Sequence, residues 1–404
     1  MKILVLNCGS SSIKYQLINT ATKEVMAIGI VERIGSSDAF LKHKTFNKEK
    51  IQIDGEVLNH STAIEYVIAV LLHPTYGVLK NIKEIDAVGH RVVHGAETFS
   101  GSVRITDDVM KALKDNIELA PLHNPPNIAG IEAVSEHLPD VIQCGVFDTA
   151  FHTTMPPHAY LYGIPYQLYE KYKIRRYGFH GTSHRYVSER AAALMKKPIT
   201  ELKIITAHLG NGASMAAILN GKSIDTTMGM TPLEGLLMGT RCGDLDPNLP
   251  LFIMEKEDLN LKEMATLLNK HSGVVGLAGL TNDMRDIEKA VEEGHERATV
   301  TLDAYNYKIK KYIGAYAAAL GGLDALVFTG GVGENSPLTR REACSGLEFM
   351  GIRLDPKKNE NAKGEFDIST SDSKVRVFKI PTNEELVIAL DTEEIVNSII
   401  KKKK

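Results

Sequence analysis

The sequence predicts an α/β protein made of two similar halves, each built on a mixed sheet. Residues 3–15 read as an apolar strand, a small polar turn containing Gly9 and a second strand, and residues 203–218 repeat this order around Gly210. Elsewhere, strand-like runs alternate with helix-like runs, which is typical of α/β layering. A chain of 404 residues is also too long for one ordinary domain. We therefore expect a duplicated fold, in which the antiparallel hairpins make the sheets mixed rather than purely parallel.

The first half of the chain shows a regular succession of strand and helix signals. Apolar runs bounded by turn residues predict strands at residues 25–33, 40–46, 51–55, 85–93 and 141–147. Helices are expected at residues 61–72 and 106–120 and directly after Pro125-Pro126. Ser61 is the expected cap of the first of these helices, which Pro74 and Gly77 end. Thr106, followed by two aspartates, is the expected cap of the second.

The second half repeats the scheme with a hairpin, a long helical region, a strand, a glycine-rich loop, a helix, a last strand and a final helix. The hairpin is expected at residues 201–220, the strands at 325–329 and 374–380, the loop at 330–335, and the helices from about Pro337 and Asn383.

Composition limits the class of protein. Hydrophobic residues make up 43% and charged residues 24% of the chain, as in soluble globular proteins. The net charge of −3 gives no reason to expect nucleic acid or a membrane as a partner. The chain has neither a run of about 18 apolar residues nor the pattern of a signal peptide. Cys8, Cys144, Cys242 and Cys344 lack the spacing of metal or redox motifs, so we expect reduced thiols in a cytoplasmic protein.

The two hairpin turns are candidate phosphate sites. Ser10, Ser12 and Lys14 flank the first turn, and residues 208–212 form the second, a His-Leu-Gly-Asn-Gly segment. Backbone N–H groups in such small, polar turns can cradle phosphate oxygens, and hydroxyl or ammonium groups can add donors. Two similar turns half a chain apart suggest that one phosphorylated ligand is held from both sides.

The opening segment resembles that of the acetate kinase family, within the larger group of acetate and sugar kinases, Hsp70 and actin. The resemblance covers essentially the whole chain, and further motifs at residues 89–95, 177–184 and 239–244 match without gaps. It implies a duplicated actin-like (ribonuclease H-like) fold with a cleft between two domains. The first domain would comprise residues 1–150 with the final helix, about 384–404, packed back onto it, and residues 151–383 would form the nucleotide-binding domain.

A nucleotide site is expected mainly in the second half. The glycine-rich segment at residues 330–335 follows an apolar strand, but Ser336 replaces the third glycine of a Rossmann fingerprint. The Gly-Lys-Ser segment at residues 221–223 resembles the end of a P-loop, but Ala216 stands where the first glycine of that motif should be, so a P-loop is excluded. The resemblance assigns ATP contacts, beside Ser10, Ser12 and Lys14, to His208, Leu209, Gly210, Asn211, Gly212, Asp283, Met284, Arg285, Gly331, Val332, Gly333, Glu334 and Asn335.

Two arginines and a histidine are candidate catalytic residues. Arg91 and Arg241 lie in glycine-flanked stretches, and a planar guanidinium can hold two oxygens of a carboxylate or phosphoryl group. The resemblance implies that these arginines bind the carboxylate and the transferring phosphoryl group, and that His180 stabilises the transition state. The spacing of His180 and His184 also suits two zinc ligands on a helix, but Gly181 replaces the glutamate that a zinc-protease motif needs.

Carboxylates complete the expected site. Asp148 ends a predicted strand, and the resemblance gives it an essential role as acid/base, orienting group or metal-linked group. A small carboxylic acid has a pKa near that of Asp and Glu, so it is ionised at neutral pH and needs no base. Asn7 and Glu384 match the family's positions for Mg²⁺, with Mn²⁺ as an alternative ion; oxygen ligands suit both.

The acyl group needs a small apolar pocket. The resemblance assigns its walls to Val93, Leu122, Phe179 and Pro232, and gives His123 a structural or substrate-orienting place. Bulky walls should favour acids of two or three carbons. One methylene changes binding by only about 1–3 kcal/mol, so propionate is the expected poorer substrate.

The resemblance implies an acetate kinase, which would form acetyl phosphate and ADP reversibly from acetate and Mg-ATP by direct in-line displacement. Closure of the two halves would exclude water, and the resemblance implies a homodimer. A propionate or other short-chain acyl kinase is the nearest alternative. A non-catalytic ATP-dependent scaffold of the actin or Hsp70 kind would need the nucleotide residues but not the arginine, histidine and aspartate set. A sugar kinase would need an aspartate base and a polar cleft.

Overall fold

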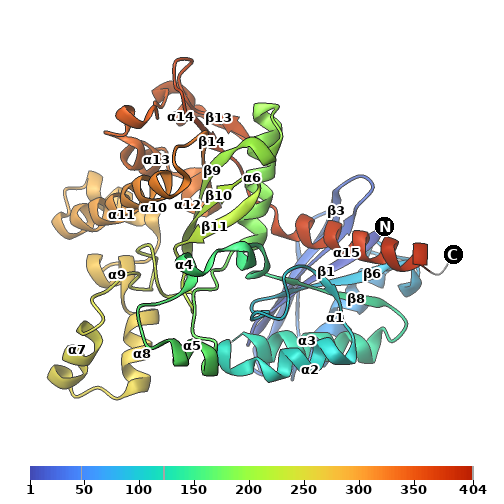
Figure 1. Cartoon of the computed structure of the whole chain (residues 1–404). Coiled ribbons are helices and arrows are strands. Elements are labelled where there is room, and N and C mark those ends of the chain that lie inside the picture. Colours follow the sequence, from blue (N-terminus) through green and yellow to red (C-terminus); the bar gives the residue numbers. More distant parts are fainter. Residues whose placement is uncertain (47, 122, 403–404) are drawn as a thin grey trace. The chain divides into compact units, whose positions relative to one another are not determined.

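The computed structural model describes residues 1–46, 48–121 and 123–402, and the chain divides into two compact units (Figure 1). Unit 1 comprises residues 1–151 and 383–404, and unit 2 comprises residues 152–382. Among the described residues, no helix is both long and apolar enough to cross a membrane.

Unit 1 contains a mixed sheet with the strand order β5-β4-β3-β2-β1-β6-β8-β7. Its strands are β1 (Lys2–Cys8), β2 (Ser12–Asn19), β3 (Glu24–Glu32), β4 (Phe40–Thr45), β5 (Ile51–Asp54), β6 (Ala87–Val92), β7 (Val103–Arg104) and β8 (Ile142–Phe147). Strands β1 to β5 form an antiparallel meander, whereas β1, β6 and β8 are parallel. The strands predicted for this half are confirmed, with most ends shifted by one or two residues; β2 extends four residues further than predicted, and the short β7 was not predicted.

Helices cover both faces of this sheet. They are α1 (His60–Leu72), α2 (Asp107–Asp115), α3 (Asn124–His137) and α15 (Glu384–Lys402), with short 3₁₀ turns at Ile82–Glu84 and Ile117–Leu119; a third 3₁₀ turn, Ala150–Thr154, begins in unit 1 and ends in unit 2. Because side chains alternate along a strand, β1 is buried on both sides. Leu4 and Leu6 join the core beneath α1, and Ile3 and Val5 join the core beneath α15.

Two helix boundaries differ from the sequence prediction. The cap of α1 is Asn59, whose side chain accepts the Thr62 N–H at 3.0 Å, and not Ser61, which lies within the helix. Thr106 caps α2 as predicted, but this helix ends at Asp115 and a 3₁₀ turn follows.

Close packing of α15 on β6 depends on Gly89. A Cβ atom at this position would lie 2.6 Å from Thr392 Oγ1 and 2.7 Å from Ile388 Cγ2, both on α15. We expect Gly89→Ala to destabilise the protein by about 1–3 kcal/mol, because the added methyl group must displace the helix or the strand. Urea unfolding measures this loss. Gly101→Ala is the control, since its Cβ would meet nothing within 4 Å, and an equal loss in both variants would contradict the argument.

Unit 2 repeats the central part of this topology. Its sheet has the order β11-β10-β9-β12-β14-β13, formed by β9 (Lys203–Leu209), β10 (Ala213–Leu219), β11 (Lys222–Thr226), β12 (Ala325–Thr329), β13 (Phe366–Asp367) and β14 (Arg376–Lys379). The series β11-β10-β9-β12-β14 matches β3-β2-β1-β6-β8 of unit 1, with three antiparallel strands followed by two parallel ones. The predicted duplicated α/β fold with mixed sheets is confirmed.

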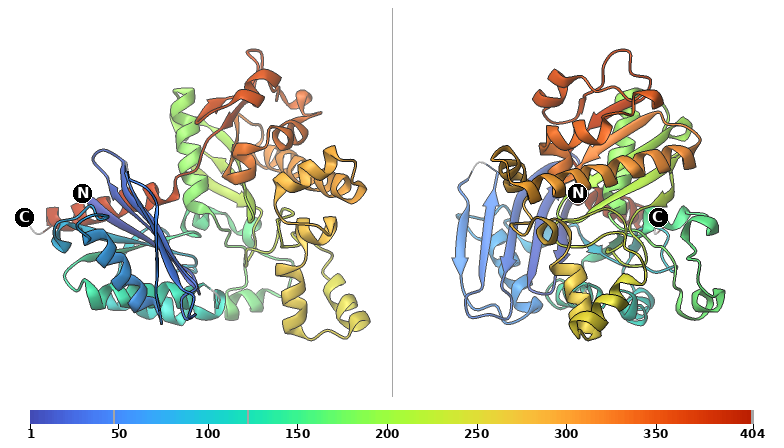
Figure 2. Two further views of the ribbon diagram at one scale, coloured as in Figure 1. Left: turned by 180° about the vertical axis from the view of Figure 1, so that it is seen from behind. Right: turned by 90° about the vertical axis from the view of Figure 1, so that its left-hand side faces the viewer.

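The helices of unit 2 include the long α11 and the polar α6, which pack against β9 and β10 from opposite faces (Figures 1 and 2). The helices are α4 (Pro157–Tyr160), α5 (Tyr166–Tyr172), α6 (Gly181–Met195), α7 (Leu249–Glu257), α8 (Leu261–Lys270), α9 (Gly273–Ala278), α10 (Met284–Glu292), α11 (Glu296–Leu320), α12 (Gly330–Asn335), α13 (Pro337–Cys344) and α14 (Pro356–Asn361), with 3₁₀ turns at Ile199–Glu201 and Glu348–Met350. The segment predicted as a glycine-rich loop is thus the short helix α12.

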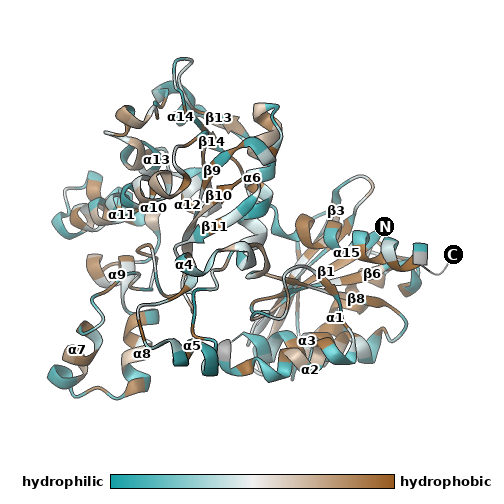
Figure 3. Cartoon of the chain, in the orientation of Figure 1, coloured by the Kyte–Doolittle hydropathy of each residue, from teal (hydrophilic) through white to brown (hydrophobic). Residues whose placement is uncertain are grey.

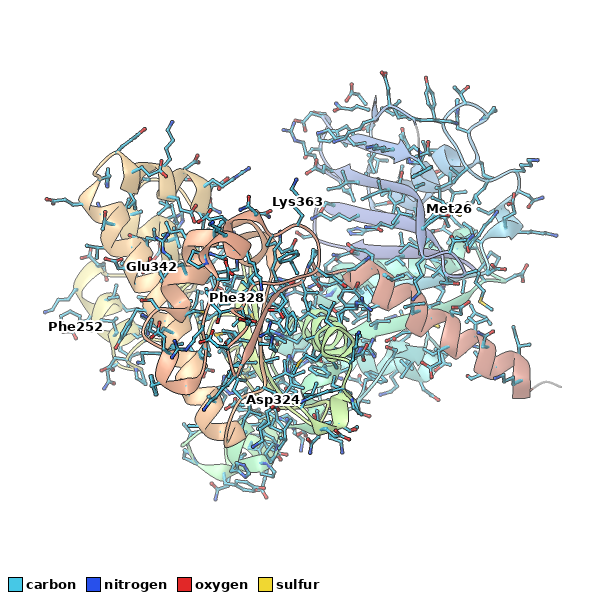
Figure 4. All side chains as sticks on the ribbon, turned by 90° about the horizontal axis from the view of Figure 1, so that it is seen from above. Met26, Phe252, Asp324, Phe328, Glu342 and Lys363 are labelled. Carbon is cyan, nitrogen blue, oxygen red and sulfur yellow. The ribbon has the colours of Figure 1, made fainter. Side chains whose placement is uncertain are left out.

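Hydrophobic residues concentrate in the strands and on the inward sides of the helices (Figure 3). Phe328 in β12 is fully buried, whereas Phe252 on α7 is 56% exposed (Figure 4). The apolar runs that predicted strands therefore form the cores of the two sheets.

Candidate active site

Three predicted site residues of unit 1 lie together at the carboxyl ends of neighbouring parallel strands. The register pairs Leu6 of β1 with His90 of β6, so Asn7 and Arg91 are neighbours. Arg91 in turn pairs with Val146 of β8, and Asp148 follows that strand directly. Functional side chains commonly gather at this edge of a parallel sheet.

Arg91 and Asp148 form a bidentate ion pair. Arg91 Nε donates to Asp148 Oδ1 at 3.0 Å and Nη2 to Oδ2 at 2.5 Å, while Nη1 lies 3.3 Å from Asn7 Oδ1. Asp148 is 1% exposed, and burial raises the pKa of its carboxyl even though Arg91 opposes this shift. Burial alone would lower the pKa of Arg91, but the charges of Asp148 and Glu384 raise it. Glu384, the first residue of α15, therefore acts on the same cluster.

Three histidines near Arg91 in the sequence or the structure differ in their surroundings. His90 is buried, its Nε2 lies 2.7 Å from Gln143 Oε1, and burial lowers its pKa to about 4. His94 is also buried and accepts the Ala96 N–H at Nδ1. His123 precedes α3 and acts electrostatically on both His94 and Asp148. His123 is therefore the histidine that the structure connects to the ion pair.

Two of the predicted acyl-pocket residues belong to unit 1. Val93 is 6% exposed, and its N–H donates to Asn127 Oδ1 at 3.1 Å. Leu122 lies outside the described residues. Phe179 and Pro232 belong to unit 2, where Phe179 is 4% exposed.

The first hairpin turn presents polar groups at the surface. Gly9 N–H donates to the Ser12 carbonyl at 2.8 Å, which closes the turn, and Ser10 and Lys14 are exposed. His60 Nε2 lies 2.8 Å from the Gly9 carbonyl and supports the turn from α1. The second turn is closed in a similar way, because Gly210 N–H donates to the Gly212 carbonyl at 3.1 Å.

Unit 2 contains a pocket of about 530 Å³ beside the second turn. Eight predicted nucleotide residues line it: Gly210, Asn211, Asp283, Met284, Arg285, Gly331, Val332 and Asn335. The structure adds six residues that no motif had indicated as ligands: Gly239, Val274, Asn282, Glu288, Tyr305 and Ser336. Asn282 donates to Asn211 Oδ1 at 2.9 Å and so joins the turn to the start of α10. Ser336 was noticed in the sequence only as a missing glycine.

The other predicted nucleotide residues of unit 2 lie near this pocket in the sequence without lining it: His208, Leu209, Gly212, Gly333 and Glu334. Leu209 and Gly333 are buried. Glu334 accepts the N–H groups of Gly330 and Thr382 at 3.1 and 3.3 Å, and burial raises its pKa. Asp283 caps α10 and pairs with Arg285, whose hydrogen bonds lower the pKa of Asp283 to about 2.

Arg241 lies next to the second turn with its charge uncompensated. A Cβ on Gly212 would lie 3.2 Å from Arg241 Nη1 and 3.6 Å from His180 Nε2, so both side chains converge there. Nη1 donates to the Pro232 carbonyl at 3.1 Å, and within the described parts of the chain Arg241 forms no ion pair with a carboxylate. Burial lowers its pKa. A half-buried cation without a counter-charge is suited to receive an anion.

A partly buried network that the sequence did not reveal holds the loop that leads to Arg241. Arg176 pairs with Glu234 and donates to the carbonyls of Thr226, Thr227 and Met228. Tyr162 donates to Glu234 Oε2 at 2.5 Å. Arg176 and Tyr162 thus hold the start of the loop after β11.

His180 is the N-cap residue of α6 and has a left-handed conformation, with φ of 56°. Its ring stacks on that of His208 with centroids 4.2 Å apart and planes at 22°. Nδ1 lies 2.9 Å from Ser214 Oγ, and His208 Nδ1 lies 2.8 Å from Ser183 Oγ. Each ring is thus held at Nδ1 by a serine hydroxyl.

The two units thus have sheets of matching topology, each with a polar hairpin turn, and unit 2 has a pocket beside an arginine that no described carboxylate neutralises. A family model described as the acetokinase family matches residues 2–390. The chain belongs to the acetokinase family, as its resemblance to the acetate kinases predicted.

Relatives and solved structures agree with this assignment over nearly the whole chain. The acetate kinase of Alkaliphilus metalliredigens is 58% identical over 98% of this chain and 100% of its own length, and that of Halothermothrix orenii is 57% identical over 98% and 100%. The crystal structure of Porphyromonas gingivalis acetate kinase superposes with a TM-score of 0.95 at 52% identity, covering 98% of this chain and 99% of that one. A propionate kinase from Francisella tularensis gives a TM-score of 0.91 at 41% identity, with the same coverage.

Proposed function

We propose that this chain is an acetate kinase, which transfers the γ-phosphoryl group of ATP reversibly to acetate and gives acetyl phosphate and ADP. The observation that carries the proposal is Arg241, a half-buried cation beside the unit 2 pocket that no described carboxylate neutralises. A phosphoryl group in transfer carries negative charge on its equatorial oxygens, and such a cation stabilises that charge. Membership of the acetokinase family supports acetate as the acceptor.

The chemistry requires positioning and charge stabilisation but no general base. Acetate is ionised at neutral pH, so its carboxylate can attack the γ-phosphorus directly and in line with the leaving ADP oxygen. We assign Arg91 to the acetate carboxylate and the phosphoryl oxygens, and Asp148 to orienting Arg91 through their bidentate pair. Arg241 and the Nε2 atom of His180 would stabilise the phosphoryl group from unit 2.

The nucleotide would occupy the unit 2 pocket, with its phosphates at the turn of residues 210–212 and further donors from Ser10, Ser12 and Lys14. The side chains of Val93, Phe179 and Pro232 would contact the methyl group of acetate. His123 would help to orient the carboxylate. Leu122, expected in the same wall, lies outside the described residues.

A magnesium ion fits the donor set of unit 1. Asn7 offers an amide oxygen next to Arg91. Glu384 is close enough to Arg91 and Asp148 to shift the pKa values of both side chains, so its carboxylate belongs to the same cluster. Mg²⁺ prefers one or two carboxylates together with waters and substrate phosphates, so Asn7 and Glu384 would be its protein ligands, and water and nucleotide would supply the others. When bound, the ion would neutralise part of the charge on the nucleotide phosphates.

The direct test is formation of acyl phosphate from Mg-ATP and carboxylic acids of one to five carbons, trapped with hydroxylamine. We expect the highest kcat/KM with acetate and a lower value with propionate, because an extra methylene changes binding by about 1–3 kcal/mol. A maximum at propionate would retain the mechanism and change the substrate. ATP binding without acyl phosphate from any acid would refute the proposal and favour a non-catalytic ATP-binding protein.

We also propose a homodimer located in the cytoplasm, as the family resemblance implies. The free state of all four cysteines is consistent with a reducing compartment. Sedimentation of the purified protein measures the oligomeric state directly, and a monomer at micromolar concentration would refute the dimer.

A further inference from the structure

The face of the unit 2 sheet beneath α6 carries polar side chains where apolar ones would be usual. Side chains two residues apart share a face of a strand, so Thr206 and His208 of β9 point the same way. The register places Ser214 of β10 opposite His208, and α6 covers this face with His184. Thr206, Ser214 and His184 are all fully buried. Buried polar groups are costly unless each is hydrogen-bonded.

These side chains form one continuous chain of hydrogen bonds that ends at His180. Thr206 Oγ1 lies 2.7 Å from His184 Nδ1, and His184 Nε2 lies 2.7 Å from Ser214 Oγ. Ser214 Oγ lies 2.9 Å from Nδ1 of His180. This series of hydrogen bonds therefore runs from β9 through α6 and β10 to His180, the residue that precedes α6.

Each hydroxyl has a single proton, so the direction of donation can be worked out. In the described part of the chain, His184 Nδ1 is the one hydrogen-bond partner of Thr206 Oγ1. The buried Thr206 hydroxyl must donate to it, because an orphaned buried donor costs about 1–3 kcal/mol. Burial lowers the pKa of His184 well below its usual value, so this ring is neutral and carries its proton on Nε2. His184 Nε2–H then donates to Ser214, whose own proton is left for His180 Nδ1.

The other end of the His180 ring faces the place where phosphoryl oxygens are expected. A Cβ on Gly212 would lie 3.6 Å from Nε2 of His180 and 3.2 Å from Nη1 of Arg241. With Nδ1 of His180 accepting from Ser214, a neutral ring must carry its proton on Nε2. Both groups then present N–H donors to one point.

We infer that Thr206, His184 and Ser214 are positioning residues that hold His180 as the neutral Nε2–H tautomer, so that Nε2–H and Arg241 donate to the same phosphoryl group. The inference rests on the proposed role of His180 in phosphoryl transfer. The tautomer does not depend on that role, which allows the two to be tested separately. We call the series of hydrogen bonds from Thr206 through His184 and Ser214 to His180 the relay. If every donor and acceptor in the relay were exchanged, the Thr206 proton would have no acceptor. Nε2 of His180 would then present a lone pair to the phosphoryl oxygens.

The tautomer is measured on the unmodified protein by nitrogen NMR with ¹⁵N-labelled histidine. The signals of His180 are assigned by their loss in His180→Gln. We expect a pyridine-like signal for Nδ1 and a pyrrole-like signal for Nε2, both unchanged when ATP is absent. A pyrrole-like Nδ1 would overturn the inference, whatever the kinetics show.

Matched variants test whether the relay sets this tautomer. Thr206→Val keeps the β-branched shape but removes the hydroxyl donor. Nδ1 of His184 then has no partner, whichever direction the remaining hydrogen bonds take. Mixed tautomer signals and at least about a two-fold fall in kcat are expected, since only one tautomer is competent. KM for acetate and for ATP should stay constant. Thr206→Ser restores the hydroxyl and should rescue both readouts.

Ser214→Ala removes the direct partner of His180 and should lower kcat about ten-fold, the equivalent of one lost hydrogen bond in the transition state. Wild-type tautomer signals in both Thr206→Val and Ser214→Ala would overturn the relay. If instead the signals change while kcat does not, and His180→Gln is also active, the relay stands and the proposed role of His180 fails.

Discussion

Replacing Arg241 with glutamine is expected to lower kcat by about 10³-fold and to leave the folded protein as stable as the parent. Removing one preorganised donor from a developing oxyanion costs about 10²–10³ in kcat, and Arg241 supplies a full charge as well. Steady-state kinetics of acyl phosphate formation, with nucleotide binding measured separately by calorimetry, tests the first part. We expect ATP still to bind, because the pocket lining does not include Arg241.

The stability of this variant distinguishes a catalytic arginine from a structural one. Burial lowers the pKa of Arg241, which means that folding disfavours its charge. Glutamine relieves that penalty and loses the hydrogen bond to the Pro232 carbonyl, a contribution of about 1 kcal/mol, and the weak 3.8 Å contact with Met238 Sδ. The two effects oppose each other, so the urea midpoint should change little.

Arg341→Gln is the matched control, because Arg341 pairs with Glu342 on the exposed side of α13. It should retain the parental kcat. A loss of kcat in Arg241→Gln that is accompanied by a large fall in the urea midpoint would indicate a structural role and contradict the assignment.

Much of the fold could be predicted because the strand signals are local. The hairpins at Gly9 and Gly210 combine an apolar period of two with a polar turn, and this pattern is independent of the rest of the molecule. The segment at residues 330–335 was predicted wrongly for the opposite reason. Each glycine in a helix costs about 1 kcal/mol, so its composition indicates a loop. The buried guanidinium of Arg340 stabilises the helix in spite of these glycines, because it donates to the Gly333 and Glu334 carbonyls at the end of α12.

The site could be predicted where its residues belong to short motifs at the ends of strands. Arg91, Asp148 and the residues around Gly210 are of this kind, and the structure places them at strand ends and at the pocket. Residues such as Thr206 and Tyr305 could not be found in this way. Thr206 is an ordinary strand residue in the sequence, and only the packing of α6 on β9 brings it to His184. Tyr305 lies in the middle of α11 and reaches the pocket through tertiary contacts alone.

Arg91→Met is expected to abolish acetate turnover and also to destabilise the protein by about 3–5 kcal/mol at neutral pH. Asp148 is 1% exposed, and Arg91 is its bidentate partner. Removing one member of a buried ion pair leaves an uncompensated charge, which is more costly than the loss of the pair as a whole. Urea unfolding at several pH values measures the effect.

The destabilisation should grow as the pH rises. Burial already raises the pKa of Asp148 above its unfolded value, and Arg91 acts to lower it, so methionine should raise it further. A carboxyl group whose folded pKa is raised binds more protons in the folded state, and stability then falls with increasing pH. The gap between variant and parent should therefore be smallest near pH 4, where the unfolded carboxyl titrates, and largest at neutral pH and above. A gap that is constant with pH would contradict this account.

Arg91→Met combined with Asp148→Asn separates stability from catalysis. Asparagine removes the orphaned charge, so the double variant should recover most of the stability lost in Arg91→Met and should lose the pH dependence of that loss. Turnover of acetate should not recover, because the double variant still lacks the Arg91 guanidinium that is proposed to hold the acetate carboxylate. A double variant that is stable and inactive assigns Arg91 to the reaction and Asp148 to holding Arg91 in place. Recovery of turnover together with stability would show instead that the pair is only structural.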